Sequence, residues 1–127
     1  MDYVRLSGGS IIGLSEVCAV LQEDGQYYLF LESTSAVFPI PQKDVLTISE
    51  WVQDAWNGKG YTVMPDTGLV VLKHINAVFV IEDEDDEEKE YVLSLKGKEH
   101  RPQLTEADYQ HLERVLYSSA QLYTRPK

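Results

Sequence analysis

Short apolar segments, separated by turn-forming residues, occupy the first forty positions of the chain and predict a series of β-strands. Gly8-Gly9 and Asp24-Gly25 supply the clearest turns between them. Pro39 and Pro41 close the last segment, because proline cannot donate a hydrogen bond to a neighbouring strand. The predicted strands cover residues 3–6, 11–14, 17–21, 27–31 and 36–40.

The spacing of apolar residues changes after Thr47 and predicts an amphipathic helix of about ten residues. Thr47 and Glu50 have the spacing of a capping box, and Asp44 is an alternative start. Asn57-Gly58 predicts the end of the helix, since both residues tolerate a left-handed backbone. The apolar stripe consists of Ile48, Trp51, Val52, Ala55 and Trp56. The two tryptophans are therefore expected in the core, with an exposed interface anchor as the alternative.

The second half of the chain shows the same order of patterns. Strands are predicted at 61–64, 69–72, 75–81 and 91–95, with turns at Pro65-Asp66 and Lys96-Gly97. A second amphipathic helix is predicted to start near Thr105 and Asp108 and to continue to about residue 123. The chain is thus expected to contain two amphipathic helices.

Aligning the halves indicates an internal repeat. Leu14, Val17, Ala19 and Val20 match Leu72, Ile75, Ala77 and Val78 at a constant offset of 58. Further matches, from Tyr27 with Tyr91 to Val52 with Leu116, keep an offset of 64. We therefore predict one α+β domain over residues 1–127, mainly antiparallel, built from two tandem strand-strand-helix units at 1–60 and 61–127.

Length and composition set the class of protein. A chain of 127 residues with 43% hydrophobic residues is typical of one globular domain. No secretion leader is recognised, and no apolar run approaches the roughly 20 residues of a transmembrane helix. Cys18 is the single cysteine and stands among apolar residues, so we expect a buried, unreactive thiol and no intrachain disulfide. These features predict a soluble cytoplasmic protein.

The negative charge is concentrated in one segment. The formal net charge is -10, and a single unbroken acidic run carries seven of these charges. This run lies between two predicted strands and is expected at the tip of a long hairpin, where it is either a solvated loop or a specific hook for a basic partner. It lacks the central glycine and ligand spacing of an EF-hand. The candidate partner-binding residues are Glu82, Asp83, Glu84, Asp85, Asp86, Glu87 and Glu88.

Motifs for catalysis are not recognised. His74, His100 and His111 do not have the spacing of a zinc site, and no nucleophile elbow, phosphate loop or dinucleotide fingerprint occurs. We therefore predict no enzyme activity, no catalytic or metal-ligating residues and no cofactor. The only candidate for holding phosphate is the basic cluster of Lys96, Lys98, His100 and Arg101.

Two segments of the second half resemble LytTR-type DNA-binding domains, which are bacterial response-regulator modules made mainly of β-strands. The resemblance rests on Leu69-Val70-Val71-Leu72-Lys73-His74-Ile75 and on Lys96-Gly97-Lys98-Glu99-His100, and the first half follows the family's order of elements. The family carries a basic, histidine-containing segment for DNA before the Val-Val strand. Residues 63–67 of this chain, Val-Met-Pro-Asp-Thr, contain no arginine or histidine.

Our leading hypothesis is a non-enzymatic protein-protein interaction module, a regulatory or neutralising partner of a basic protein that binds through the acidic hairpin. Because of the net charge and residues 63–67, we expect nucleic acid to be an unlikely partner. No membrane partner is expected, since no apolar run is long enough to cross a bilayer as a helix. One alternative is a degenerate LytTR-like DNA-binding transcriptional regulator that uses Lys96, Lys98 and Arg101. Further alternatives are a nucleic-acid-mimicking inhibitor and a small-molecule sensor or enzyme that uses a cavity between the two repeats. The oligomeric state is left open.

Overall fold

The computed structural model describes residues 2–126, apart from the side chains of residues 83, 86 and 87. The first half contains β1 (Tyr3–Arg5), β2 (Ile11–Gly13), the 3-10 turn η1 (Leu14–Glu16), β3 (Val17–Glu23), β4 (Gln26–Leu31), β5 (Val37–Ile40) and α1 (Gln42–Trp56). The second half contains β6 (Tyr61–Val63), β7 (Gly68–Val71), the 3-10 turn η2 (Leu72–His74), β8 (Ile75–Asp83), β9 (Asp86–Leu95), β10 (Gln103–Leu104) and α2 (Glu106–Ser118).

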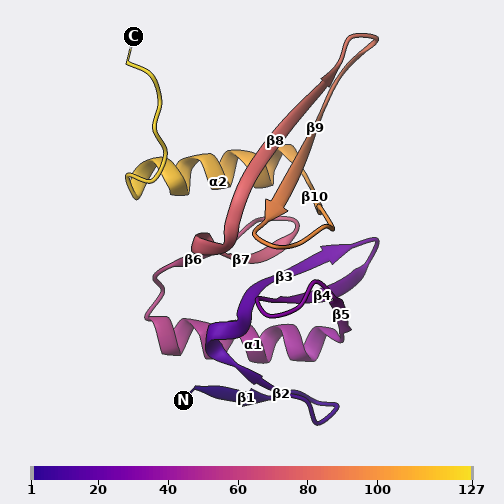
Figure 1. Ribbon diagram of the computed structural model, residues 1–127, viewed down its shortest axis with the longest axis vertical. Coiled ribbons are helices and arrows are strands. Elements are labelled where there is room, and N and C mark those ends of the chain that lie inside the picture. The colour runs from indigo at the N-terminus through magenta and orange to yellow at the C-terminus, as the bar shows by residue number, and fades with distance from the viewer. Residues whose placement is uncertain (1, 127) are drawn as a thin grey trace.

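The strands form three antiparallel sheets that lie in layers. A central sheet has the order β5-β4-β3-β7-β6, and the others are β1-β2 and β10-β9-β8. In Figure 1, α1 and the β1–β2 hairpin lie on one side of the central sheet, and α2 and the β8–β9 hairpin lie on the other. The predicted α+β class, mainly antiparallel with two helices, is therefore confirmed.

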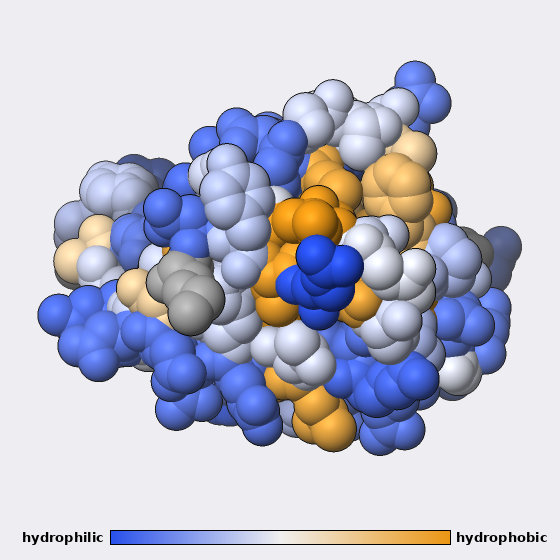
Figure 2. Space-filling view, turned by 90° about the horizontal axis from the view of Figure 1, so that it is seen from below, coloured by the Kyte–Doolittle hydropathy of each residue, from blue (hydrophilic) through white to orange (hydrophobic). Residues whose placement is uncertain are grey.

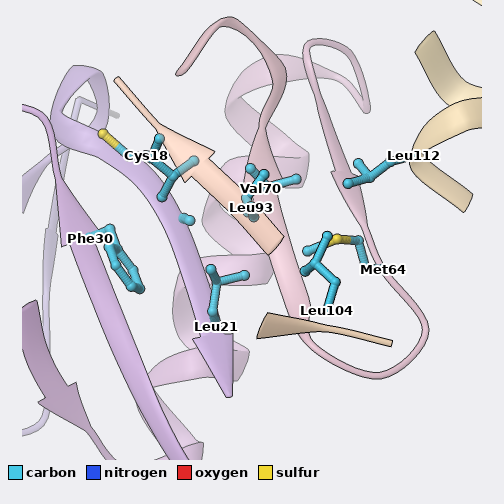
Figure 3. Close-up of a cluster of buried hydrophobic side chains, with 10 residues drawn as sticks. Cys18, Leu21, Phe30, Met64, Val70, Leu93, Leu104 and Leu112 are labelled. Carbon is cyan, nitrogen blue, oxygen red and sulfur yellow. The ribbon is translucent and has the colours of Figure 1, made fainter. Parts of the chain in front are cut away.

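The core is divided in two by the central sheet, because successive side chains of a strand point to opposite faces. Val70 faces a cluster that includes Leu93, Leu95 and Leu112. Figure 3 shows Val70, Leu93 and Leu112 converging from the sheet, β9 and α2. Leu69 and Val71 point to the other face, where they join a cluster with Ile48 and Val52 of α1. The apolar stripes predicted for both helices therefore pack on opposite faces of one sheet.

The first helix starts earlier than its sequence pattern suggests. Helix α1 begins at Gln42 after Pro41, so the predicted start at Thr47 is wrong, and the Thr47 hydroxyl donates to the Lys43 carbonyl inside the helix. Asp44, the alternative start, lies in the first turn, where it accepts hydrogen bonds from Ser7 at 2.9 Å. This contact with a distant turn explains why local spacing did not locate the start.

The second helix ends earlier than predicted. Its predicted start is confirmed, since Thr105 is the N-cap and forms a reciprocal capping box with Asp108. The helix stops at Ser118 because Ala120 adopts a left-handed φ of 60° and the backbone N–H groups of Gln121 and Leu122 turn back to the Leu116 carbonyl. Leu122 therefore belongs to the tail that follows α2.

The acidic run is the tip of the β8–β9 hairpin, as expected, but much of it belongs to the strands. Glu82 pairs with Lys89 across the hairpin, and their side chains form an ion pair at 3.2 Å. The turn itself is reduced to residues 84 and 85. Cross-strand pairing of opposite charges extends both strands beyond their apolar segments.

The two halves contain the same seven elements in the same order. Strand β1 pairs with β2 so that Tyr3 lies opposite Gly13, and β6 pairs with β7 so that Tyr61 lies opposite Val71. Strands β3 and β8 both have a register shift one residue after their first residue. Their surroundings differ, because β3 has neighbours on both edges and β8 has a neighbour on one.

Candidate functional site

A groove of about 510 Å³ lies where three turns meet at one end of the central sheet. The β3–β4 turn, the β6–β7 turn and the segment that leads from β9 through β10 to α2 form its walls. The groove thus collects residues that are more than 70 positions apart in the chain. Its lining residues are Gln22, Glu23, Asp24, Gly25, Asp66, Thr67, His100, Arg101, Gln103 and Thr105.

The β6–β7 turn is held in place by the first turn of α2. The Asp108 carboxylate accepts hydrogen bonds from the backbone N–H of Asp66 at 2.9 Å and of Thr67 at 3.3 Å, and also from the Thr67 hydroxyl. The Thr105 hydroxyl donates to the Asp66 carboxylate at 2.6 Å. One wall of the groove is therefore a rigid turn rather than a loose loop.

These hydrogen bonds also decide the charge state of Asp108. Burial alone would raise the pKa of its carboxyl group, but the bonds donated by Thr67, Asp66 and Thr105 favour the carboxylate, and the net shift of the pKa is downward. Asp108 is completely buried. It is therefore a carboxylate at neutral pH that fastens the turn, and its burial makes it unavailable to a ligand.

Another wall of the groove carries its basic side chains, His100 and Arg101. The His100 imidazole lies 2.8 Å from a Glu23 carboxylate oxygen and stacks on the Phe30 ring at a centroid distance of 6.1 Å. The Arg101 guanidinium lies over the Phe79 ring, 5.7 Å from its centroid. Arg101 is exposed, so its N–H donors can reach a ligand while the guanidinium group lies over the Phe79 ring.

The electrostatics of the groove are mixed. Glu23, Asp24 and Asp66 supply carboxylates to the same surface as His100 and Arg101. Asp66 is occupied by the Thr105 hydroxyl and Glu23 by His100. An anion that enters the groove is attracted by Arg101 and is opposed by neighbouring carboxylates, so its binding depends on salt and on Glu23.

The basic cluster expected from the sequence is divided by the fold. His100 and Arg101 line the groove, whereas Lys98 is buried and its ammonium group donates to the Glu32 carbonyl at 3.2 Å. Lys96 is exposed, and its backbone N–H donates to the His74 carbonyl beside η2. Only the second part of the predicted cluster therefore lies in the groove.

The predicted partner-binding run lies next to the groove. Glu82, Glu84, Asp85 and Glu88 line a shallow hollow along the β8–β9 hairpin that shares Gln103 with the groove. The side chains of Asp83, Asp86 and Glu87 lie outside the described residues. The assignment of this run to partner binding stays a prediction.

Other candidate side chains have structural surroundings. Cys18 is buried, as predicted, and burial raises the pKa of its thiol, which keeps it protonated at neutral pH. The His111 ring lies 2.7 Å from the Thr62 hydroxyl between α2 and β6. His74 is buried, and its Nε2 atom has no hydrogen-bond partner within residues 2–126.

No group of three or more His, Cys, Asp and Glu side chains in the described part of the chain is placed to hold a metal ion. No helix in residues 2–126 is long and apolar enough to cross a membrane. We take the groove as the candidate functional site because it brings basic and acidic side chains from three distant segments together.

Comparisons with known proteins give one match. No model of a protein family matches the chain, and no curated protein matches it. Among solved structures, the chain is similar to the "LytTr DNA-binding domain of putative methyl-accepting/DNA response regulator from Bacillus cereus", with a TM-score of 0.54 and 15% identity. The match covers 91% of this chain and 97% of that domain.

This match corrects our expectation about partners. Nucleic acid was expected to be an unlikely partner, and this exclusion is contradicted by the similarity to a DNA-binding domain. The expected protein partner with a basic surface gains no support from it. The exclusion rested on the net charge and on the absence of arginine and histidine from residues 63–67, whereas the fold brings His100 and Arg101 to the β6–β7 turn from a distant segment. The chain has the fold of a LytTR-type domain.

Proposed function

We propose that the chain is a DNA-binding regulatory domain of the LytTR type and that the groove beside the β6–β7 turn contacts the DNA backbone. The observation that carries the proposal is the structural similarity, over 91% of the chain, to a domain described as DNA-binding. The position of the groove supports it, because residues 63–67 stand where the LytTR family places a DNA-contacting segment. Arg101 is the exposed cation of this surface.

The proposed contacts are few, and this sets the expected affinity. Arg101 can donate two parallel hydrogen bonds to a phosphate, and the His100 imidazole can add one when it leaves Glu23. The adjacent acidic hairpin and the net charge of -10 oppose the approach of DNA. We therefore expect weak binding that decreases steeply with salt.

The test is fluorescence anisotropy with a labelled mixed-sequence DNA duplex, measured from low to physiological salt. Arg101→Ala is expected to weaken binding about tenfold and to reduce the salt slope by about one, as the loss of one phosphate contact requires. Arg114→Ala is the matched control, since Arg114 is an exposed arginine on α2 outside the groove and its removal changes the net charge equally. The absence of binding at the lowest salt, or equal effects of the two substitutions, would contradict the proposal.

Two further properties belong to this proposal. The domain acts without catalysis, as the sequence predicts, and it works in the cytoplasm, where a free thiol such as Cys18 stays reduced. We also propose that the halves are copies of one unit. The identical order of elements, the matching registers of the β1–β2 and β6–β7 hairpins and the paired roles of Asp44 and Asp108 support this origin.

A further inference from the structure

Each sheet in residues 2–126 ends in strands with a free edge, and two of these edge strands, β2 and β8, belong to sheets at opposite ends of the stack. Strand β2 pairs with β1 on one edge, and β8 pairs with β9 on one edge. In Figure 1, β1–β2 lies beyond α1, and β8 lies on the far side of the central sheet. A free strand edge presents unpaired backbone N–H and C=O groups, which can pair with another chain.

The central sheet shows how such edges are filled within the chain. Strand β3 of the first half pairs antiparallel with β7 of the second half, so that Ala19 lies opposite Val70 and Val20 opposite Leu69. This pairing joins the three strands β5-β4-β3 to the two strands β7-β6. The five-stranded sheet is thus a contact between the two halves.

The outer sheets contain the counterparts of β3 and β7, but these counterparts do not pair with each other within the chain. By the offset of 58, β8 is the counterpart of β3, with Ala77 and Val78 in place of Ala19 and Val20. Likewise β2 is the counterpart of β7, with Ile11 and Ile12 in place of Leu69 and Val70. The sheets of three and two strands correspond to the two parts of the central sheet.

We propose that copies of this chain associate head to tail, with β2 of one copy pairing antiparallel with β8 of the next. The inference rests on the proposed repeat and is independent of DNA binding. The expected register places Ile12 opposite Ala77 and Ile11 opposite Val78, as β7 and β3 are paired within the chain. A five-stranded sheet of order β10-β9-β8-β2-β1 then spans two copies.

An apolar groove receives the incoming strand. A hollow of about 400 Å³ lies between β8 and α2, lined by Val78, Leu112 and Leu116, with Leu122 of the tail at its border. At the corresponding place in the central sheet, Leu69 and Val71 of β7 pack in the same cluster as Ile48 and Val52 of α1, the counterparts of Leu112 and Leu116. Ile11, the counterpart of Leu69, is 58% exposed and can enter this groove.

Exposed apolar side chains lie at both ends of the proposed contact. Tyr3 and Ile11 are exposed on β1–β2, and Phe79, Val80 and Ile81 are exposed on β8. Figure 2, which views the lower face, shows apolar residues gathered near its centre and surrounded by hydrophilic ones. Apolar patches with a polar rim are typical of interaction surfaces.

The pairing is expected to be short. Gly68, which continues β7 beyond Leu69, has a φ of +133° and approaches β3 so closely that a Cβ atom would overlap the Val20 carbonyl. Its counterpart is Ser10, which has a Cβ atom. The contact is therefore expected to be looser where Ser10 lies opposite Phe79 than at Ile11, and we expect a weak, concentration-dependent association.

When two copies bind through two different surfaces, the assembly still exposes one free surface of each kind, to which further copies can bind. Such heterologous contacts build rings or open filaments, whereas a contact between identical surfaces stops at a dimer. Two variants separate these cases, because Ile11→Lys blocks the β2 surface and Phe79→Lys blocks the β8 surface. Both side chains are more than 40% exposed, so neither substitution empties the core.

Analytical ultracentrifugation over a range of concentrations is the measurement. The unmodified chain is expected to exceed the mass of a dimer as its concentration increases. Each variant alone is expected to need at least about tenfold higher concentration to associate, since burial of an unpaired charge is costly. A mixture of the two variants is expected to form a dimer and no larger species, because each retains the surface that the other lacks.

Tyr117→Lys is the matched control, since Tyr117 is 68% exposed on α2, outside the groove beside β8, and the substitution adds the same charge. It is expected to associate like the unmodified chain. An unmodified chain that stays monomeric at every concentration overturns the proposal. A dimer that Ile11→Lys leaves unchanged, or a mixture that does not dimerise, overturns it as well. Dimer formation in the mixture would itself show that both variants are folded.

Discussion

Thr67 donates both its backbone N–H and its hydroxyl group to the buried carboxylate of Asp108. This relationship joins the β6–β7 turn to the first turn of α2, and Asp108 also accepts from the backbone N–H of Thr105 at 3.1 Å. One carboxylate therefore caps a helix and fixes a wall of the groove. Ser7 and Asp44 form the corresponding contact in the first half, with two hydrogen bonds at 2.9 Å.

Asp108→Ala is expected to lower the free energy of unfolding by about 3 kcal/mol, because the substitution leaves buried donors without an acceptor. Asp44→Ala is the matched comparison and is expected to cost less, since Asp44 accepts hydrogen bonds from a single residue, Ser7, on the distant turn. Urea denaturation followed by circular dichroism measures both. Equal losses for the two variants would show that the extra bonds of Asp108 do not contribute to stability.

Gly68→Ala is expected to destabilise the contact between the two halves. The positive φ of Gly68 is unfavourable for alanine, and the new methyl group would overlap the Val20 carbonyl in the pairing of β7 with β3. We expect a loss of at least about 2 kcal/mol in the free energy of unfolding. Gly8→Ala is the control, because no atom lies within 4 Å of a Cβ atom added there. A thermal unfolding midpoint that is the same for both variants would contradict this account.

Sequence patterns predicted the class of fold and most strands, because alternation and helical spacing are local properties. They located α2 by Thr105 and Asp108, whose capping box is also local. They placed the start of α1 too late, since Asp44 is fixed by Ser7, 37 residues away. The two-residue strand β10 was missed because it is too short to show a pattern.

The candidate groove could not be predicted for a similar reason. His100 and Arg101 were recognised as cations, but their position beside the β6–β7 turn depends on how β9 and β10 pack against the central sheet. Lys98 looked equivalent to Arg101 in the sequence, yet its ammonium group is used by the Glu32 carbonyl. A list of charges along the chain does not distinguish a structural cation from an available one.

The stability of the fold is expected to decrease as the pH falls below about 6.5 because of His74. Burial lowers the pKa of His74; the nearby Glu32 opposes this effect, and the charges of Lys73, Lys96 and Lys98 add to it. His74 therefore binds a proton at a higher pH in the unfolded chain than in the folded chain. As a result, the free energy of unfolding decreases as the pH falls from the ordinary pKa to the lowered pKa, and this effect is complete below the lowered pKa. Above the ordinary pKa, the titration of His74 does not change the free energy of unfolding.

His74→Leu tests this dependence, since leucine also removes the buried Nε2 atom that has no partner within residues 2–126. The variant is expected to be at least as stable as the unmodified chain at pH 8 and to lose less stability between pH 7 and pH 5. Urea denaturation at each pH gives the difference. A constant difference over this range would show that His74 does not titrate differently in the two states.

Glu23→Gln is expected to strengthen the proposed binding of DNA. The Glu23 carboxylate faces the groove and holds the His100 imidazole at 2.8 Å, so it both repels phosphate and occupies a potential donor. Its neutralisation is expected to raise the affinity for the mixed-sequence duplex about threefold to tenfold at low salt, and less at high salt. The measurement is the same anisotropy titration that tests Arg101.

Glu50→Gln provides the control for Glu23→Gln, because Glu50 is an exposed residue of α1 outside the groove and its neutralisation changes the net charge by the same amount. A change that depends on net charge alone would affect the two variants equally. A larger gain for Glu23→Gln would place the DNA backbone near His100, because screening limits the effect of an exposed charge to about 10 Å at moderate salt. Equal gains would mean that DNA approaches another surface, and the role of Arg101 would then have to be abandoned.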